Sequence, residues 1–299
     1  MTHGQALNPH VAVVTRFAPS PTGRLHAGHG ASAIAAHDFA RSRGGRFVLR
    51  IEDIDGTRSR REHVDAILAD LRWLGLTWDG PVLFQSQHLA AYDAALDTLR
   101  DKRLLYPCFC TRKEIAREVA ESMAAPHHGP DGPVYPGTCR SLTPEARAAG
   151  IATRPHCWRL DMAKASVLAG PLEWTDHGQG VRADPQAHGD VVLARKDAPA
   201  SYHLAVTIDD AAQGVSDIIR GKDLYPATHV HRLLQALLGL PVPRYHHHAL
   251  VTDARGERLA KRNGAPSLES LRLAGTDGAA VAAELRAGRV PLGIADTTP

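Results

Sequence analysis

The chain has 299 residues, 43% hydrophobic and 22% charged, with a formal net charge of +3, which is typical of a globular protein with two or three structural units. No apolar run approaches the roughly 20 residues that cross a bilayer, and the N-terminus lacks the layout of a secretory signal. We therefore expect a cytoplasmic protein without membrane contacts. A weak positive charge alone does not establish a nucleic-acid partner.

The first third of the chain alternates between strand and helix patterns. Val11–Val14 and Arg46–Ile51 are apolar runs typical of buried parallel strands. Strong helix formers occupy Ala31–Ala40, and the spacing of apolar residues from Val64 to Leu74 predicts an amphipathic helix, with another from about Ser86. This alternation predicts an α/β fold with a parallel sheet.

The pattern changes between residues 106 and 189, where cysteines, prolines and glycines accumulate and periodicity is weak. We interpret this stretch as an insertion that divides the α/β domain into a first half, 11–105, and a second half, 190–299. The α/β pattern resumes at 190–195 and 202–210, and a helix is expected from Thr228. Further on, the sequence predicts a strand at Ala249–Val251. The preceding His246–His248 cannot all face one metal, because neighbours on a strand alternate sides.

The segment between the first strand and the first helix, Arg16–Gly30, reads RFAPSPTGRLHAGHG. Its prolines forbid a regular element, and His26 and His29 lie about one turn apart where the helix begins. A helix start attracts anions, and two imidazoles there can hydrogen-bond phosphate oxygens. A bare H-x-x-H would favour a solvated loop, but the preceding RFAPSPTG makes the signal far more specific.

This segment resembles the HIGH region of class I aminoacyl-tRNA synthetases, in the form found in the glutamyl branch. The resemblance implies that the helix start binds ATP, with His26 and His29 as catalytic and ATP-binding residues. It also implies that Arg16, Ala18 and Ser20 lie beside the amino acid. The expected fold is then a Rossmann-like parallel sheet with an inserted, zinc-containing subdomain that contacts the acceptor.

Glu52 follows the second predicted strand, at the end where open α/β sheets bind ligands. A carboxylate there could hold an ammonium group. The alternative is a salt-bridged strand end that faces the basic run at Arg58, Arg60 and Arg61. The run RIEDIDGTR resembles the second fingerprint of the glutamyl family, which implies that Glu52 holds the α-amino group of the bound amino acid.

Arg220 closes an apolar strand pattern before a glycine. An arginine there suits a carboxylate or a phosphate, although a surface ion pair is the better explanation of the residues alone. The family resemblance makes Arg220 the partner of the side-chain carboxylate of glutamate and places Tyr202 in the same pocket.

The cysteines are too few for a disulfide framework, and three of them cluster, which indicates metal binding. The resemblance implies a structural site for one zinc ion per chain. Its candidate ligands are Cys108, Cys110, Tyr135 and Cys139. Phenolate is an uncommon zinc ligand, so His127 and His128 stay open as the fourth donor, and free thiols are the alternative to any site. Cys157 is expected in a core.

The segment Glu257–Gly264 resembles the mobile KMSKS loop of class I synthetases. Lys261 would lie over the phosphates of ATP and is expected to be catalytic. The segment departs from the family pattern at Ala260, where serine is usual, and at Arg258, where lysine is common.

The ordered motifs resemble the glutamyl class I group from Val11 to Leu268, which implies activation of glutamate by ATP with Mg²⁺. Only 31 residues follow Leu268 (299 − 268), so we expect no anticodon-binding domain. Such a catalytic core resembles the glutamyl-queuosine tRNA(Asp) synthetase family, in which glutamate is attached to queuosine in the tRNA(Asp) anticodon. The expected partners of this monomer are ATP, L-glutamate and queuosine-containing tRNA(Asp).

Three alternatives remain open for the acceptor and the activity. A minimal glutamyl-tRNA synthetase would charge a tRNA 3′ end. A second kind of enzyme would pass the acyl group to a small molecule or a carrier protein. A paralogue without catalysis would only bind nucleotide or tRNA.

Overall fold

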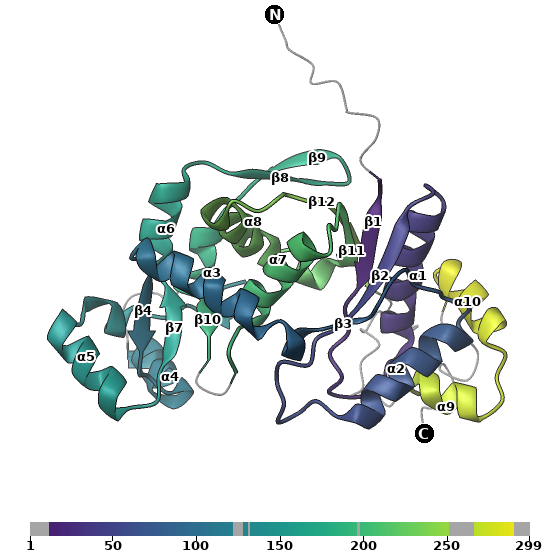
Figure 1. Cartoon of the computed structure of the whole chain (residues 1–299), viewed down its shortest axis with the longest axis horizontal. Coiled ribbons are helices and arrows are strands. Elements are labelled where there is room, and N and C mark those ends of the chain that lie inside the picture. Colours follow the sequence, from purple (N-terminus) through teal and green to yellow (C-terminus); the bar gives the residue numbers. More distant parts are fainter. Residues whose placement is uncertain (1–11, 122–127, 131, 196–197, 251–265, 290–299) are drawn as a thin grey trace, which may run out of the picture.

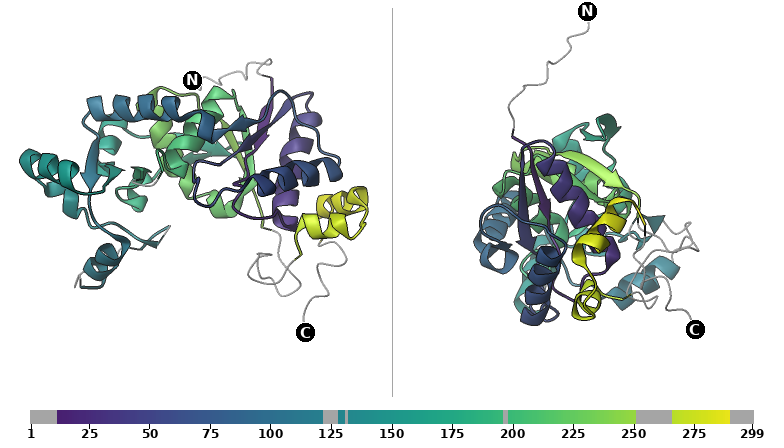
Figure 2. Two further views of the ribbon diagram at one scale, coloured as in Figure 1. Left: turned by 60° about the horizontal axis from the view of Figure 1, so that its bottom comes forward. Right: turned by 90° about the vertical axis from the view of Figure 1, so that its right-hand side faces the viewer.

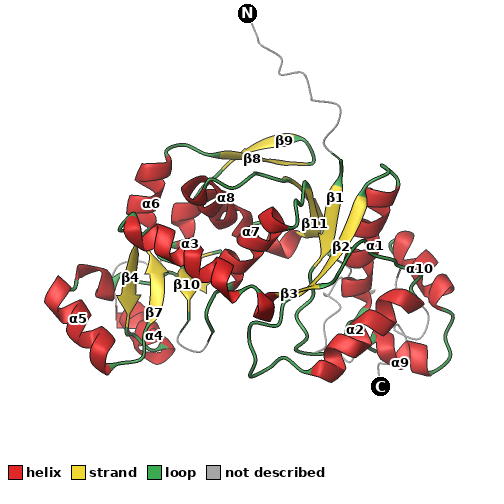
Figure 3. Ribbon diagram, viewed as in Figure 1, coloured by secondary structure: helices red, strands yellow, loops and turns green. Residues whose placement is uncertain are grey.

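A parallel sheet forms the centre of the molecule, which the computed structural model describes for residues 12–121, 128–130, 132–195, 198–250 and 266–289 (Figures 1 and 3). The strands of this sheet are β1 (Val14–Phe17), β2 (Arg46–Ile51), β3 (Leu83–Phe84), β11 (Asp217–Gly221) and β12 (Arg244–His248). The pairs β1–β2, β2–β3 and β11–β12 are parallel. A 2.9 Å hydrogen bond from Ser216 N to Val14 O joins β11 to β1. The carboxyl ends of these strands therefore meet at one edge.

Two further strands extend the sheet beyond β12. The strand β8 (Glu173–Asp176) lies parallel to β12, and β9 (Gln179–Arg182) returns antiparallel to β8. Both belong to the stretch 106–189, so this stretch contributes directly to the central sheet.

Helices cover both faces of the sheet. The helices α1 (Ala27–Arg41), α2 (Arg61–Trp73), α9 (Leu268–Leu273) and α10 (Gly278–Arg286) share one apolar core with β2. The second core joins α3 (Leu89–Asp101), α6 (Met162–Ala169), α7 (Tyr202–Ala212) and α8 (Ala227–Leu238). In Figure 2 the yellow C-terminal helices lie beside α1. Alternation along β2 sends Phe47, Leu49 and Ile51 into the first core.

A smaller antiparallel sheet lies at the end of the molecule opposite α9 and α10 (Figure 1). Its strands are β4 (Leu105–Cys108), β7 (Cys157–Leu160) and β10 (Val192–Ala194), in the order β10-β7-β4. The other elements of this part of the chain are α4 (Arg112–Glu121), α5 (Pro144–Thr153), β5 (His128–Gly129) and β6 (Gly132–Pro133). Short 3₁₀ helices occupy Gln85–Gln87, Thr138–Ser141, Pro185–His188 and Lys222–Leu224.

Two predicted strands are displaced in the structure. The first begins at Val14 instead of Val11, because β1 pairs with β2 only from Val14 to Phe17. The strand expected at Ala249–Val251 is not found at Ala249 and Leu250, because β12 ends at His248, where its pairing with β11 ends, and Val251 lies outside the described residues. The expected strand Arg46–Ile51 is confirmed. Among the described helices, none has both the length and the apolar character that crossing a bilayer would require.

Candidate active site

A cavity of about 460 Å³ opens at the carboxyl ends of β1, β2, β11 and β12. Its lining includes the described residues that the motifs predicted for glutamate and ATP, namely Arg16, Ala18, Ser20, His26, His29, Glu52, Tyr202 and Arg220. These residues come from four separate segments, and the parallel sheet brings them together because its strands end at one edge. Lys261, the last predicted site residue, lies outside the described residues.

Arg16 is the last but one residue of β1 and is only 5% exposed. Its Nε donates a 3.0 Å hydrogen bond to Oδ1 of Asp210 on α7, and its Nη2 lies 3.5 Å from Oδ2. Asp210 also accepts a hydrogen bond from the fully buried Arg50. Burial alone would raise the pKa of Asp210, but the two guanidinium groups lower it. Asp210 is therefore a carboxylate that orients Arg16.

Glu52 follows β2 and points to the same side as Arg50, away from the first apolar core. Its Oε1 lies 4.0 Å from Nε of Arg50. Burial raises the pKa of Glu52 to about 7, although Arg50 opposes that shift. Of the alternative partners, Arg58 pairs with Asp55, and Arg61 pairs with Asp65. Glu52 thus faces the cavity as a carboxyl group whose charge responds to what binds beside it.

Arg220 is 4% exposed, so the interpretation as a surface ion pair is wrong. Its Nη2 donates to Thr228 Oγ1 (2.7 Å) and to Leu224 O (3.1 Å). Its Nε donates to Nε2 of His247 (3.1 Å), and its Nη1 reaches the hydroxyl of Tyr202 at 3.4 Å. Every described partner is thus neutral, and a cation held by neutral groups suits an anionic ligand.

The two histidines of the H-x-x-H motif form the N-terminal cap of α1. Nδ1 of His26 accepts from the backbone N–H of Gly28 (3.1 Å), and Nδ1 of His29 accepts from that of His26 (3.2 Å). The rings lie 3.8 Å apart between centroids. Because both Nδ1 atoms are acceptors, each neutral ring carries its proton on Nε2. Capping therefore sets the tautomer that can donate to a phosphate oxygen.

The three consecutive histidines are part of β12, and their side chains alternate as expected, so that His246 and His248 share one face of the strand and His247 lies on the other. His246 bonds Asp217 (3.0 Å) outside the cavity, whereas His248 contacts Ser32 Oγ (3.0 Å) in the cavity wall. His247 faces Arg220 and is 7% exposed.

Sequence reasoning missed several residues that surround the site. Arg50 opens the RIEDIDGTR run but was given no role, and Asp210 is a buried charge in a run that was interpreted only as an element of the fold. Asp176 ends β8, in the stretch assigned to an insertion, and its Oδ1 accepts from Nδ1 of His247 at 3.0 Å. A charged residue in the otherwise apolar strand β2 was the available signal for Arg50, whereas Asp176 lies in the polar strand EWTD and had no such signal.

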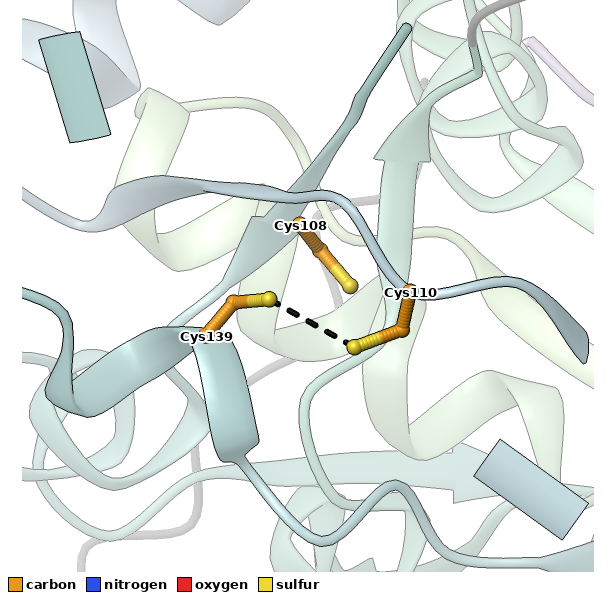
Figure 4. Close-up of side chains that lie close together, drawn as sticks. All are labelled: Cys108, Cys110 and Cys139. Carbon is orange, nitrogen blue, oxygen red and sulfur yellow. Dashed lines mark hydrogen bonds between the residues drawn. The ribbon is translucent and has the colours of Figure 1, made fainter. Parts of the chain in front are cut away.

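Three cysteine sulfurs converge in the part of the chain that contains β4 (Figure 4). The Sγ atoms of Cys108, Cys110 and Cys139 all lie within 4.8 Å of one another. The hydroxyl of Tyr135 is 3.4 Å from the Cys108 sulfur and 3.5 Å from the Cys110 sulfur. The cluster could therefore bind a metal ion, and Tyr135 is placed to act as a fourth donor. The side chains of His127 and His128 lie outside the described residues.

Cys157 and Arg159 on β7 adjoin the cluster. Cys157 is the cross-strand partner of Cys108 and is half-buried, not enclosed in a core. Hydrogen bonds from Cys157, Tyr135 and Arg159 lower the pKa of the Cys108 thiol, against the opposing effect of burial. Arg159 also lies 3.9 Å from the ring centroid of Tyr135. The surroundings thus favour the thiolate of Cys108, the form that binds metal, whereas burial raises the pKa of Cys110 to about 12.

Comparison with known proteins places these features in a family. The model for the catalytic domain of class I tRNA synthetases (E and Q) matches residues 12–286. The glutamyl-Q tRNA(Asp) synthetase of Rhodobacter capsulatus is 48% identical over 266 residues, covering 88% of this chain and 96% of that protein. The protein of the same name from Nocardia farcinica is 46% identical over 268 residues, covering 89% and 81%.

Solved structures agree with this relationship. The glutamate-tRNA synthetase of Elizabethkingia anophelis has a TM-score of 0.72 at 29% identity, covering 85% of this chain and 53% of its own. The glutamate tRNA ligase of Elizabethkingia meningosepticum, solved with its amino acid, has a TM-score of 0.71 at 29% identity, covering 84% and 52%. This chain thus spans about half the length of these two enzymes.

The fold and the motifs at the cavity define a class I tRNA synthetase catalytic domain of the glutamate and glutamine group. Within that group the chain belongs to the glutamyl-Q tRNA(Asp) synthetase family.

Proposed function

We propose that the protein activates L-glutamate with ATP and transfers the glutamyl group to queuosine in the anticodon of tRNA(Asp). The observation that carries this proposal is one cavity that combines Arg16, Glu52 and Arg220 with the His26–His29 helix start. The family membership supports the acceptor.

Charge complementarity explains how the cavity would select glutamate. Glutamate carries one ammonium and two carboxylate groups. Glu52 would hold the ammonium group, which favours the ionised form of Glu52 on binding. Arg220 would receive the side-chain carboxylate beside Tyr202, and Arg16 would lie next to the amino acid with Ala18 and Ser20. Arg16 is oriented by Asp210 before any ligand arrives, so the pocket is preorganised.

Activation needs no side chain as a base, because the reacting carboxylate is already ionised. One of its oxygens forms a bond to the α-phosphorus of ATP while the bond from that phosphorus to the bridging oxygen breaks. Glutamyl adenylate and pyrophosphate result. The Nε2–H groups of His26 and His29 and the N–H groups at the start of α1 would donate to phosphate oxygens as their charge shifts. Lys261 would supply a cation over the phosphates, and ATP would enter with Mg²⁺.

Transfer is a second displacement at the acyl carbon. A hydroxyl oxygen of the cyclopentenediol of queuosine attacks this carbon, AMP leaves with the electron pair of the broken bond, and the hydroxyl proton passes to solvent. Alignment of the hydroxyl with the adenylate is the main requirement.

We also propose that the cysteine cluster holds one structural zinc ion. Three sulfur donors and one phenol oxygen make a set of four, the coordination number of structural zinc sites. The ligands would be Cys108, Cys110, Cys139 and Tyr135. When bound, the ion would supply cross-links between β4, the 3₁₀ helix at Thr138–Ser141 and the segment before it.

The proposed organisation keeps the sequence divisions, with one addition. Residues 11–105 and 190–299 would form the two halves of the catalytic domain, to whose sheet β8 and β9 add, and residues 106–189 would contain the tRNA-contacting, zinc-holding part. The protein is proposed to act as a monomer in the cytoplasm.

Glutamate-dependent exchange of labelled pyrophosphate into ATP tests the proposal. We expect exchange with glutamate, weak exchange with glutamine, and activity without tRNA. A family member that only binds nucleotide or tRNA would show no exchange with any amino acid, with or without tRNA, and that result would overturn the proposal.

A further inference from the structure

A chain of hydrogen bonds leads from Arg220 away from the cavity into the protein. Nε of Arg220 donates to Nε2 of His247 at 3.1 Å, and Nδ1 of His247 lies 3.0 Å from Oδ1 of Asp176. The three residues come from β11, β12 and β8, which are consecutive in the central sheet. The chain therefore crosses three strands and ends on a segment remote in sequence from both catalytic motifs.

The partners of His247 determine its tautomer. Arginine can only donate, so Nε2 of His247 must accept, and the ring proton must lie on Nδ1. Asp176 is the acceptor for that proton, and its Oδ1 also accepts from the backbone N–H of His247 at 3.0 Å. Burial and the charge of Arg220 lower the pKa of His247 to about 4, so the ring is neutral at physiological pH.

Packing fixes the plane of the imidazole ring. The ring is stacked on Tyr245 with an interplanar angle of 2° and meets Trp174 edge to face, at 5.8 Å between centroids. With its plane held, His247 offers its Nε2 lone pair to the Nε–H of Arg220, and Thr228 Oγ1 lies 3.4 Å from the same nitrogen. Thr228 Oγ1 and Leu224 O also accept from the Nη2 group of Arg220. Among the described contacts of Arg220, Nη1 has only the long one to Tyr202.

We infer that His247 and Asp176 are positioning residues that hold the guanidinium of Arg220 in the orientation that receives the side-chain carboxylate of glutamate. The inference rests on the proposed function, since it assigns a role in recognising the substrate named there. Without the acceptor on His247, the buried Nε–H of Arg220 loses its partner, and the guanidinium is expected to rotate. The affinity for glutamate and the preference for glutamate over glutamine should then fall, whereas the affinity for ATP, whose proposed site is the start of α1, should stay unchanged.

The test compares His247→Leu with His247→Gln in pyrophosphate exchange, with His246→Leu as the matched control. For His247→Leu we expect the KM for glutamate to rise about tenfold or more, with the KM for ATP within about twofold. The preference for glutamate over glutamine should fall by a similar factor. His247→Gln offers Oε1 as an acceptor, and it should recover most of the affinity for glutamate and most of the preference for glutamate over glutamine. His246 bonds Asp217 outside the cavity, so His246→Leu should resemble the wild type.

Asp176 supplies a second pair of variants, which decides the matter if His247→Leu does not fold. Asp176→Asn keeps an acceptor for Nδ1–H and should stay near the wild type, whereas Asp176→Leu frees the tautomer and should raise the KM for glutamate. Equal rises in the KM values for glutamate and ATP, or no recovery with His247→Gln, would overturn the inference. A wild type that exchanges pyrophosphate only with another amino acid would instead overturn the proposed function.

Discussion

Nε of Arg16 donates a 3.0 Å hydrogen bond to Oδ1 of Asp210, which ties a cavity-lining arginine at the end of β1 to the buried face of α7. Arg50 donates to the same carboxylate oxygen. Two strands and one helix thus meet at a single aspartate. The cost of burying these charges is offset only while all of them are present.

Asp210→Asn should lower the free energy of unfolding by roughly 3 kcal/mol, because it removes the counter-charge of two buried guanidinium groups. Chemical denaturation at neutral pH measures this loss. The exposed pair Arg61–Asp65 gives the control: Asp65→Asn should leave the midpoint almost unchanged. The pKa of Asp210 is lowered in the folded protein, so its contribution is present above the pKa of an unfolded aspartate and is lost as the pH falls through the folded value. Equal losses of unfolding free energy in Asp210→Asn and Asp65→Asn would contradict this account.

Glu52 should make glutamate binding depend on pH. Its pKa of about 7 means that much of the unliganded protein carries a neutral carboxyl group just below that pH. The ammonium group of glutamate favours the carboxylate, so binding there should release a proton and weaken as the pH falls. Calorimetry in two buffers of different ionisation enthalpy measures the release. Asp53 neighbours Glu52 in sequence, and its carboxylate accepts a hydrogen bond from Ser86. Asp53→Asn should therefore keep the proton release, whereas Glu52→Gln should abolish the proton release together with most of the affinity for glutamate. A wild type that releases no proton would contradict the assignment.

His26 has two proposed roles, capping α1 through Nδ1 and donating to a phosphate through Nε2–H, and one substitution can distinguish them. In His26→Asn the amide oxygen can still accept from the start of α1, since asparagine is a good N-cap, but no N–H reaches as far as Nε2. We expect near-wild-type thermal stability and about a hundredfold slower adenylate formation. His26→Ala should lose the cap as well, at a further cost of about 1 kcal/mol in stability. Adenylation by His26→Asn at the wild-type rate would show that the ring acts only as a cap.

The metal proposal predicts one zinc ion per purified chain. Cys110→Ser should lose the ion, and Tyr135→Phe should bind it at least about tenfold more weakly, a difference of about 1.4 kcal/mol. Cys157→Ser, which alters a neighbour of the cluster and not a proposed ligand, should retain it. Metal analysis and competition with a chelator give both results. Full affinity in Tyr135→Phe, with loss on replacing His127 and His128, would transfer the fourth position to a histidine.

Much of the fold could be predicted from local patterns. The apolar run Arg46–Ile51 is β2 to the residue, because it is buried on both faces of a parallel sheet. Thr111 and Glu114, three residues apart in a pattern that favours a capping box, form a reciprocal cap of α4. The pairing of β8 with β12 could not be predicted, because it joins segments about 70 residues apart through few backbone hydrogen bonds.

Most of the cavity residues predicted from the sequence had motif neighbours, since Arg16, Ala18, Ser20, His26, His29 and Glu52 lie in the two quoted motifs near the start of the chain. Asp210 and Asp176 had none, since their roles come only from the tertiary contact each makes with a histidine or an arginine. A carboxylate that orients another side chain has no local pattern of its own. The structure was needed to find such residues.

Transfer of labelled glutamate to tRNA tests the central claim most directly. The reaction would contain ATP, Mg²⁺ and tRNA pools prepared with and without queuosine. The account predicts label on tRNA(Asp) only when queuosine is present. Label on the 3′ end of tRNA(Glu), whether or not queuosine is present, would contradict it and identify a small conventional glutamyl-tRNA synthetase.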